Sequence, residues 1–449
     1  MFLSKSKSIS SRIFLRSFKT PQKSIQFSRG YSNNPSIGTR VSNTAFGLVG
    51  IALAGFFGFY VTDSRSNIHE YITVPLMQQL DAEKAHYLSI KALSYGLGPV
   101  DRKQDNECLK TEIWGMKLSN PIGLAAGYDK NGEVADKLLD LGFGAVEVGS
   151  ITPKPQEGNP RKRLFRLSNN NAAINRMGLN NDGFDVVKSR LKKRFWNNVA
   201  NQQLDNEENA KTSVSQAKHT INKSGRDNRL LGINISKNHS SPSDSDQDFL
   251  DGIDQLGSLA DYVVINVSCP NVTNLGAGSD LILLDKTMKS ARTHCDALGT
   301  KKPALVIKLG PDYTENDLKL ISELALKNDI DGIITSNTSR SRPECLKSDE
   351  PNASEMGGLS GPPIRNLSLN TTRLVYKFTN GKIPIIGCGG VSSAEDVLEY
   401  GRAGASFVQL YTGMVYTGPG IVSKIKDDMV VLLNGKKWDD IVGSGHKSN

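Results

Sequence analysis

Side chains that could bind or transform a small molecule lie at the ends of most of the short apolar runs of this 449-residue chain, or directly after them. They are Lys130, Ser150, Asn234, Asn266, Cys269, Asn271, Lys308, Ser336, Asn337, Thr338, Tyr411 and Thr412. Asparagine amides both donate and accept hydrogen bonds, so this set suits a planar ligand with imide and carboxylate groups better than a sugar or a metal. Glycine-lined turns at Gly389 and Gly390 favour a phosphate site, because backbone N–H groups can point at the anion.

Other chemistries fit these positions less well. None of them is a histidine and the carboxylates do not cluster, which argues against metal-dependent hydrolysis and glycosidase chemistry. A single asparagine after a strand is more often a turn residue or a helix cap. Lys308 could instead form a Schiff base, as in aldolases. The prediction of a binding pocket therefore depends on the joint pattern rather than on any one residue.

Eight short apolar runs precede these side chains and are typical of strands buried on both faces of a parallel sheet. They are 121–126, 144–149, 231–235, 261–267, 304–309, 331–335, 383–387 and 405–410. Helical spacing occurs between runs, for example at 315–327 and 393–403. The pattern predicts an α/β fold, a (β/α)8 barrel with its chemistry on the loops after the strands. A doubly wound sheet is the alternative, but no GxGxxG motif supports it.

Charge and cysteine content exclude several protein classes. The net charge is +9, but residues 1–62 hold eight Lys or Arg and no acid, so the remainder carries only about +1. A nucleic-acid-binding face is therefore not indicated. Five cysteines without a CxxC pair argue against a disulfide scaffold, a zinc site or an iron–sulfur cluster. Nothing in the sequence indicates an obligate protein partner.

The N-terminus has the composition of a targeting sequence followed by a membrane anchor. Residues 1–44 are basic, rich in serine and free of acid, which predicts a mitochondrial transit peptide rather than a generic basic tail. Residues 45–61 form an apolar run just long enough to span a bilayer as a single helix. A buried core helix and a secretory signal are the alternatives. Because the basic residues precede the run, the positive-inside rule places the body across the membrane from the N-terminus.

Two further regions flank or interrupt the barrel, which is predicted to span 111–449. Residues 62–110 include two helical patterns within 67–97, separated near Asp81. These helices either cap the bottom of the barrel or lie at the membrane surface, and the pattern alone favours neither. Residues 197–228 are polar and mixed in charge, which predicts a surface insert without a catalytic part.

Several long motifs resemble the class 2 dihydroorotate dehydrogenases. They are NPIGLAAGYDKNGE (120–133), VEVGSITPKPQEGNPRKRLFRL (146–167), INRMGLNNDG (174–183), NVSCPN (266–271), GGLSGPPI (357–364) and IIGCGGVSS (385–393). The likeness covers roughly residues 67–435. It implies FMN in the barrel mouth and oxidation of dihydroorotate to orotate in the fourth step of pyrimidine synthesis. It also implies that ubiquinone reoxidises the flavin, arriving through the N-terminal helical pair, so that residues 62–110 form a helical quinone-access segment. It also implies a single-pass protein of the mitochondrial inner membrane, with the catalytic domain facing the intermembrane space.

The resemblance assigns roles to residues at the matching positions. The residues implied to hold FMN are Ala126, Gly127, Lys130, Ser150, Asn234, Asn266, Lys308, Ser336, Gly361, Gly390, Tyr411 and Thr412. Those implied to hold dihydroorotate are Lys130, Asn175, Arg176, Met177, Gly178, Leu179, Asn266, Asn271, Asn337 and Thr338. His86 and Arg166 match positions on the quinone tunnel, and Lys308 and Cys269 match catalytic positions.

One position departs from the family pattern. Class 2 enzymes use a serine base in an SSPN motif, whereas this chain has Ser268-Cys269-Pro270-Asn271, similar to the cysteine base of the soluble class 1 enzymes. The following residues 272–276 also differ from the usual TPGLR-like sequence. The anchor and the 146–167 motif favour a class 2 enzyme with a cysteine base. A tRNA-uridine-reducing flavoenzyme and a non-catalytic membrane scaffold are the remaining alternatives.

Overall fold

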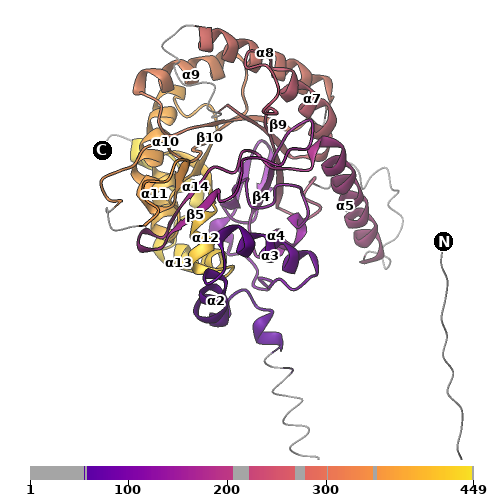
Figure 1. Ribbon diagram of the computed structural model, residues 1–449, viewed down its shortest axis with the longest axis vertical. Helices are drawn as coiled ribbons and strands as arrows, with labels where there is room; N and C mark the ends of the chain where they lie inside the picture. Colours follow the sequence, from indigo (N-terminus) through magenta and orange to yellow (C-terminus); the bar gives the residue numbers. More distant parts are fainter. Residues whose placement is uncertain are drawn as a thin grey trace, which may run out of the picture. The chain divides into compact units, whose positions relative to one another are not determined.

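The protein folds around a closed barrel of parallel strands surrounded by helices (Figure 1). The computed structural model describes Gly55 and residues 58–205, 222–267, 279–300, 302–346 and 351–446. The eight barrel strands follow the order β10-β12-β13-β3-β4-β7-β8-β9. The predicted barrel is therefore confirmed, and each of the eight predicted runs overlaps one of its strands.

The barrel strands are β3 (Ile122–Leu124), β4 (Ala145–Ile151), β7 (Leu230–Ile235), β8 (Tyr262–Asn266), β9 (Ala304–Leu309), β10 (Gly332–Thr335), β12 (Ile385–Cys388) and β13 (Ala405–Leu410). The helices around them are α4 (Ala135–Asp140), α5 (Gly183–Asp205), α7 (Gln247–Leu256), α8 (Ser279–Ala297), α9 (Glu315–Lys327), α10 (Arg365–Thr379), α11 (Ala394–Arg402), α12 (Thr412–Thr417), α13 (Ile421–Leu433) and α14 (Trp438–Ile441). Helices α9 and α11 begin with capping boxes at Thr314 and Ser393, which satisfy backbone N–H groups that would otherwise lack partners.

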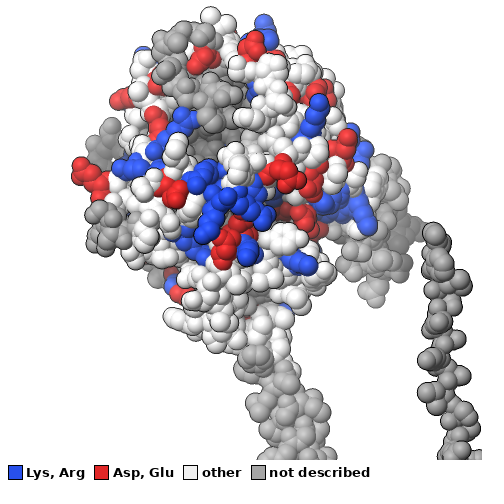
Figure 2. Space-filling model, in the orientation of Figure 1, with Lys and Arg blue, Asp and Glu red and all other residues white. Residues whose placement is uncertain are grey.

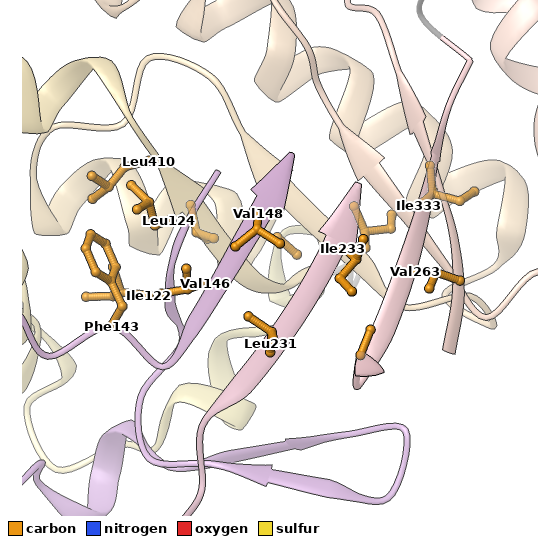
Figure 3. Close-up of a cluster of buried hydrophobic side chains, with 14 of the residues drawn as sticks. Ile122, Leu124, Phe143, Val146, Val148, Leu231, Ile233, Val263, Ile333 and Leu410 are labelled. Atoms are coloured by element: carbon orange, nitrogen blue, oxygen red, sulfur yellow. The ribbon is translucent and has the colours of Figure 1, made fainter. Parts of the chain in front are cut away.

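Side chains alternate along the barrel strands between the helices and the barrel interior. On β4, Val146 and Val148 belong to the large cluster packed against the helices (Figure 3), whereas Ala145 belongs to the interior cluster. Period-2 alternation therefore directs Glu147 inward with Ala145. Both faces of the strands are buried, which explains why the runs are almost continuously apolar.

A short hairpin lies at the end of the barrel where the strands begin. It consists of β1 (Thr111–Ile113) and β2 (Met116–Leu118), and its turn residue Trp114 packs against the interior cluster. The Trp114 indole N–H donates to the carbonyl of Asp331, just before β10, at 2.7 Å. The bottom of the barrel is therefore covered by this hairpin.

The N-terminal helical pair lies at the opposite end. A π-helical turn (His69–Thr73) leads into α2 (Val74–Gln78), and α3 (Ala82–Ser94) follows after Asp81, whose carboxylate accepts from the N–H of Lys84. The Tyr128 hydroxyl, in the loop after β3, donates to Ser89 Oγ of α3 at 2.8 Å. The interpretation of the pair as a cap on the barrel bottom is therefore wrong, because it contacts the loops at the strands' C-terminal ends.

A second sheet beside the barrel mouth was not predicted. Strands β5 (Leu164–Leu167), β6 (Ala172–Asn175) and β11 (Gly358–Ser360) pair antiparallel in the order β11-β6-β5. Two of these strands come from one long excursion after β4 and the third from the excursion after β10. Each is too short for its alternation to stand out in the sequence.

Some predictions fall outside the described residues. These are the transit peptide at 1–44 and nearly all of the predicted anchor at 45–61. Within the described part of the chain, no helix is long and apolar enough to cross a membrane.

The boundaries of the 197–228 insert need correction. Helix α5 continues to Asp205, and Ser224 is fully buried, with the N–H groups of Lys223 and Ser224 donating to Asp261 at 2.7 and 3.1 Å. The two ends of the predicted insert therefore belong to the folded body, and residues 206–221 lie outside the described residues.

Replacing residues 206–221 with a few glycines and serines should leave turnover within about threefold of the parent, which is under 1 kcal/mol on the barrier. The reason is compositional, because this polar segment offers little apolar area to offset the entropy of ordering. Steady-state kinetics checks the expectation. A matched deletion that also removes 222–225 should lower the melting temperature, because it takes away two of the backbone N–H groups that donate to Asp261. A large loss of turnover in a folded 206–221 deletion would contradict this interpretation.

Candidate active site

A cavity of about 1910 Å³ opens at the C-terminal ends of the barrel strands and extends to the N-terminal helical pair. Nearly all predicted site residues that the structure describes line it. These are His86, Ala126, Gly127, Lys130, Ser150, Arg166, Asn175, Arg176, Met177, Gly178, Leu179, Asn266, Lys308, Ser336, Asn337, Thr338, Gly361, Gly390, Tyr411 and Thr412. Predicted residues from the ends of all the barrel strands except β7 are thus brought together, because parallel strands end on one side of the barrel.

Two neighbouring strands deliver the amide and amine groups at the floor of the cavity. Asn266 on β8 is in register with Lys308 on β9, and the Lys308 side chain is only 6% exposed. Asn337, after β10, donates from Nδ2 to Asn266 Oδ1 at 3.4 Å. The described asparagines therefore lie side by side, as the sequence predicts.

Three predicted site residues do not appear on the cavity wall. Asn234 is fully buried one step below it, where its Oδ1 accepts from Ser150 Oγ at 2.5 Å. Cys269 and Asn271 lie outside the described residues, so their roles stay predictions.

Lys130 stands at the side of the cavity nearest helix α3. Burial and the nearby Arg163 guanidinium lower its pKa to about 8, and this value already includes the opposing effect of Glu83 and Asp129. Glu83 of α3 is bound by Arg163, whose Nη2 donates at 2.7 Å. Lys130 remains mostly cationic at pH 7, a charge suited to a carboxylate ligand.

The loop 175–179 forms another wall, and Arg163 fixes it in place. The Arg163 carbonyl accepts from the N–H of Arg176 at 2.9 Å. The Arg176 guanidinium lies over the Phe165 ring and donates to Glu355 at 2.7 Å. In this structure the Arg176 charge is therefore paired with protein groups, so the backbone of the loop is its more direct contribution to a ligand.

Glycine turns and a helix start form the part of the cavity best suited to a phosphate. Gly389 and Gly390 have φ values of 126° and 70°, and Gly361 has a φ of 99°. A Cβ atom on Gly390 would lie 2.6 Å from Arg365 Cβ and 3.0 Å from the Gly361 carbonyl, so the two turns pack closely. Helix α11 begins at Ala394, directly after this turn. Exposed backbone N–H groups and a helix N-terminus are the usual means of binding phosphate.

The end of the cavity between α2 and α3 is mostly apolar. His86 stacks edge-on against Tyr128 with ring centroids 5.2 Å apart, and burial lowers its pKa to about 3, so the imidazole is neutral. Arg166 donates to the carbonyls of Gln78 and Leu80 at 3.1 and 2.7 Å, at the C-terminal end of α2. Its guanidinium therefore satisfies the last carbonyls of the helix while lining the cavity.

Sequence reasoning missed a polar layer inside the barrel. Glu147 on β4, Tyr262 on β8 and Gln409 on β13 are fully buried and bonded to one another. The sequence could have indicated Glu147, because it is a charged residue inside the otherwise apolar run 144–149. Such a residue is rarely buried without a partner, so a polar partner inside the barrel could have been predicted. Arg163 was missed as well, because its charged partner, Glu83, lies 80 residues earlier in the chain.

Comparison with known proteins gives a consistent assignment. A family model described as dihydroorotate dehydrogenase matches residues 108–433. The chain is 41% identical to the mitochondrial dihydroorotate dehydrogenase (quinone) of Kluyveromyces lactis, covering 89% of this chain and 90% of that protein. It is 42% identical to the mouse protein of the same name, covering 84% and 90%. The ligand-free crystal structure from Eimeria tenella has 35% identity and a TM-score of 0.71, covering 82% and 100%. The chain thus belongs to the dihydroorotate dehydrogenase family, in its quinone-dependent class 2 branch.

Proposed function

We propose that this protein oxidises dihydroorotate to orotate, with FMN as the hydride acceptor and ubiquinone as the final electron acceptor. The observation that supports this proposal most directly is one continuous cavity, which joins a polar, amide-lined floor to an apolar end between α2 and α3. A polar substrate and a hydrophobic quinone can then approach the same redox centre from different sides. Family membership supports the same reaction.

The described residues fit a flavin mononucleotide. The glycine turns around Gly361 and Gly390 suit its phosphate, and the buried Lys308 amine suits a ring system that gains negative charge on reduction. Ala126, Gly127, Ser150, Asn266, Ser336, Tyr411 and Thr412 line the space between them. When bound, FMN supplies the hydride-accepting chemistry that side chains lack.

The chain's own groups bind, orient and deprotonate the substrate. Lys130 supplies positive charge for the carboxylate, and Asn266 and Asn337 supply amide donors and acceptors for the imide. Cys269 is the proposed base that accepts the C5 proton on its Sγ. Burial of the floor excludes water and strengthens each of these interactions.

The outer surface of the N-terminal helical pair supports contact with a bilayer. Tyr71, Ile72, Leu76 and Tyr87 are exposed by 53 to 70% and do not line the cavity. Figure 2 shows few charged side chains over α2, whereas Lys and Arg gather nearer the middle of this face. An exposed apolar surface of this kind is typical of an interaction site. We propose that it rests on the mitochondrial inner membrane, held by the predicted 45–61 anchor, with the catalytic domain in the intermembrane space.

The function is tested with purified protein under anaerobic conditions. We expect a flavin absorption spectrum that bleaches on adding dihydroorotate and recovers on adding a soluble ubiquinone. A protein that carries no flavin, or whose flavin is not reduced by dihydroorotate, would overturn the proposal. Reduction without recovery by quinone would overturn only the quinone part.

Blocking the apolar end of the cavity should separate the two half-reactions. Ala92 of α3 lines the cavity, and Ala92→Trp should lower kcat/KM for quinone by about tenfold or more, the effect of ~1.4 kcal/mol of overpacking. Flavin reduction by dihydroorotate should stay near the parent rate. The matched control is Lys91→Trp, at an exposed neighbouring position that does not line the cavity. Equal loss of both half-reactions in folded Ala92→Trp would count against quinone access at this end.

A further inference from the structure

Glu147 is a buried carboxylate for which the proposed reaction has no use. It lies inside the barrel on β4 and is fully buried. Among the described residues, Lys308 is the cation that approaches it, with Nζ 4.0 Å from Glu147 Oε1. A charge in such a place is costly unless other groups compensate it.

Three neighbouring side chains donate hydrogen bonds to Glu147. Asn234 Nδ2 donates to Oε1 at 2.8 Å, and Gln409 Nε2 donates to Oε2 at 2.7 Å. The Tyr262 hydroxyl makes a longer contact with Oε2 at 3.4 Å. These donors hold the carboxylate in one orientation inside the barrel.

Two barrel strands have a glycine at a position where any side chain would take up the space of this layer. A Cβ atom on Gly232 of β7 would lie 2.2 Å from the Tyr262 ring. A Cβ atom on Gly123 of β3 would lie 3.2 Å from Gln409 Cγ. Two glycines thus admit the donors that hold Glu147, which indicates a specific arrangement rather than an incidental buried acid.

The layer is connected to the cavity wall. Asn234 donates to Glu147 through its Nδ2 and accepts from Ser150 through its Oδ1, so both ends of the amide are used. Ser150 Oγ in turn accepts from Asn266 Nδ2 at 3.4 Å. Ser150, Asn266 and Lys308 all line the cavity, whereas Glu147 and Asn234 lie beneath it.

We propose that Glu147 is a positioning residue for Lys308 that sets the reduction potential of the flavin. This inference rests on the proposed function. The Lys308 ammonium stabilises negative charge on a reduced flavin and so raises its potential. The Glu147 carboxylate holds the ammonium from below and offsets part of its charge, which lowers the potential again.

Measuring the flavin midpoint potential tests the proposal directly. Glu147→Gln removes the charge at nearly constant shape and should shift the potential to more positive values. A tenfold change in the ratio of oxidised to reduced flavin is the expected minimum, about 30 mV for a two-electron couple. Glu147→Asp keeps the charge and should stay closer to the parent. Gln409→Met removes one donor and neither charge, and should shift the potential by less than Glu147→Gln does.

A double-mutant cycle shows whether Glu147 acts through Lys308. In a Lys308→Met background, Glu147→Gln should move the potential far less than it does alone. The double variant leaves no unpaired buried charge. Where Glu147→Gln alone fails to fold, Gln409→Met, measured with and without Lys308, takes its place in the cycle. Asp261→Asn is the matched control, because it removes another buried carboxylate, one that holds backbone N–H groups where β7 and β8 begin. It should lower the melting temperature without moving the potential.

The outcomes separate this inference from the function itself. An unchanged potential in flavin-loaded Glu147→Gln, or an equal shift with and without Lys308, would overturn the role of Glu147. A parent protein without reducible flavin would instead overturn the proposed function.

Discussion

Cys269→Ala should slow flavin reduction by dihydroorotate about 10²–10⁴-fold, the usual contribution of a positioned general base. Flavin binding should be retained, and stopped-flow absorbance measures the step. An unperturbed thiol has a pKa of about 8.5, far below that of a serine hydroxyl, so a cysteine base releases its proton more readily. The rate in the parent should therefore rise with pH and level off above the thiol pKa.

Serine at position 269 gives the sharpest comparison, because it restores the family's usual residue. Cys269→Ser should keep partial activity and move the rising limb to higher pH. Thiol alkylation should inactivate the parent and orotate should protect it, best measured in a Cys345→Ala background because Cys345 is exposed. Undiminished flavin reduction in Cys269→Ala would show that the base lies elsewhere, with Ser268 the first alternative.

Lys308→Ala should slow flavin reduction by about 10²-fold or more, the scale expected when one preorganised charge partner is lost from a closed site. The effect should be large because the Lys308 side chain is nearly buried. Water therefore has little access to the site and cannot supply the stabilisation that the lost positive charge provided. Lys327→Ala is the control, since this lysine pairs with Asp285 on the exposed surface and should change the rate little. Near-normal reduction in Lys308→Ala, or a Schiff base trapped at Lys308 by borohydride, would contradict the electrostatic role.

Much of the barrel could be predicted because its strands are short, apolar and buried on both faces. The run 304–309 coincides with β9, and 405–410 coincides with β13. The strand ends also predicted which polar side chains meet, because parallel strands all end at one mouth. Asn266 and Lys308 are an example, since neither residue alone is a strong signal.

What sequence reasoning missed depends on contacts between distant segments. The position of the helical pair could not be settled, because an amphipathic pattern shows which face is buried but not against what. The contact between Tyr128 and Ser89 decided it. The β5-β6-β11 sheet was missed because its strands are three or four residues long and one comes from far along the chain. Asn234 matched a ligand position but is buried beneath the cavity wall. The spacing of residues along the sequence does not show how far a side chain lies from the cavity surface.

The missing side chains at Gly123 and Gly232 also constrain how this barrel can evolve. Even an alanine at 232 would collide with the ring of Tyr262, and one at 123 would press on Gln409. A lineage can therefore gain a side chain at either glycine only after its partner has become smaller. Because both partners hold the same carboxylate, each such replacement would also loosen Glu147. The order in which substitutions are tolerated is thus restricted, and we expect these positions to change together or not at all.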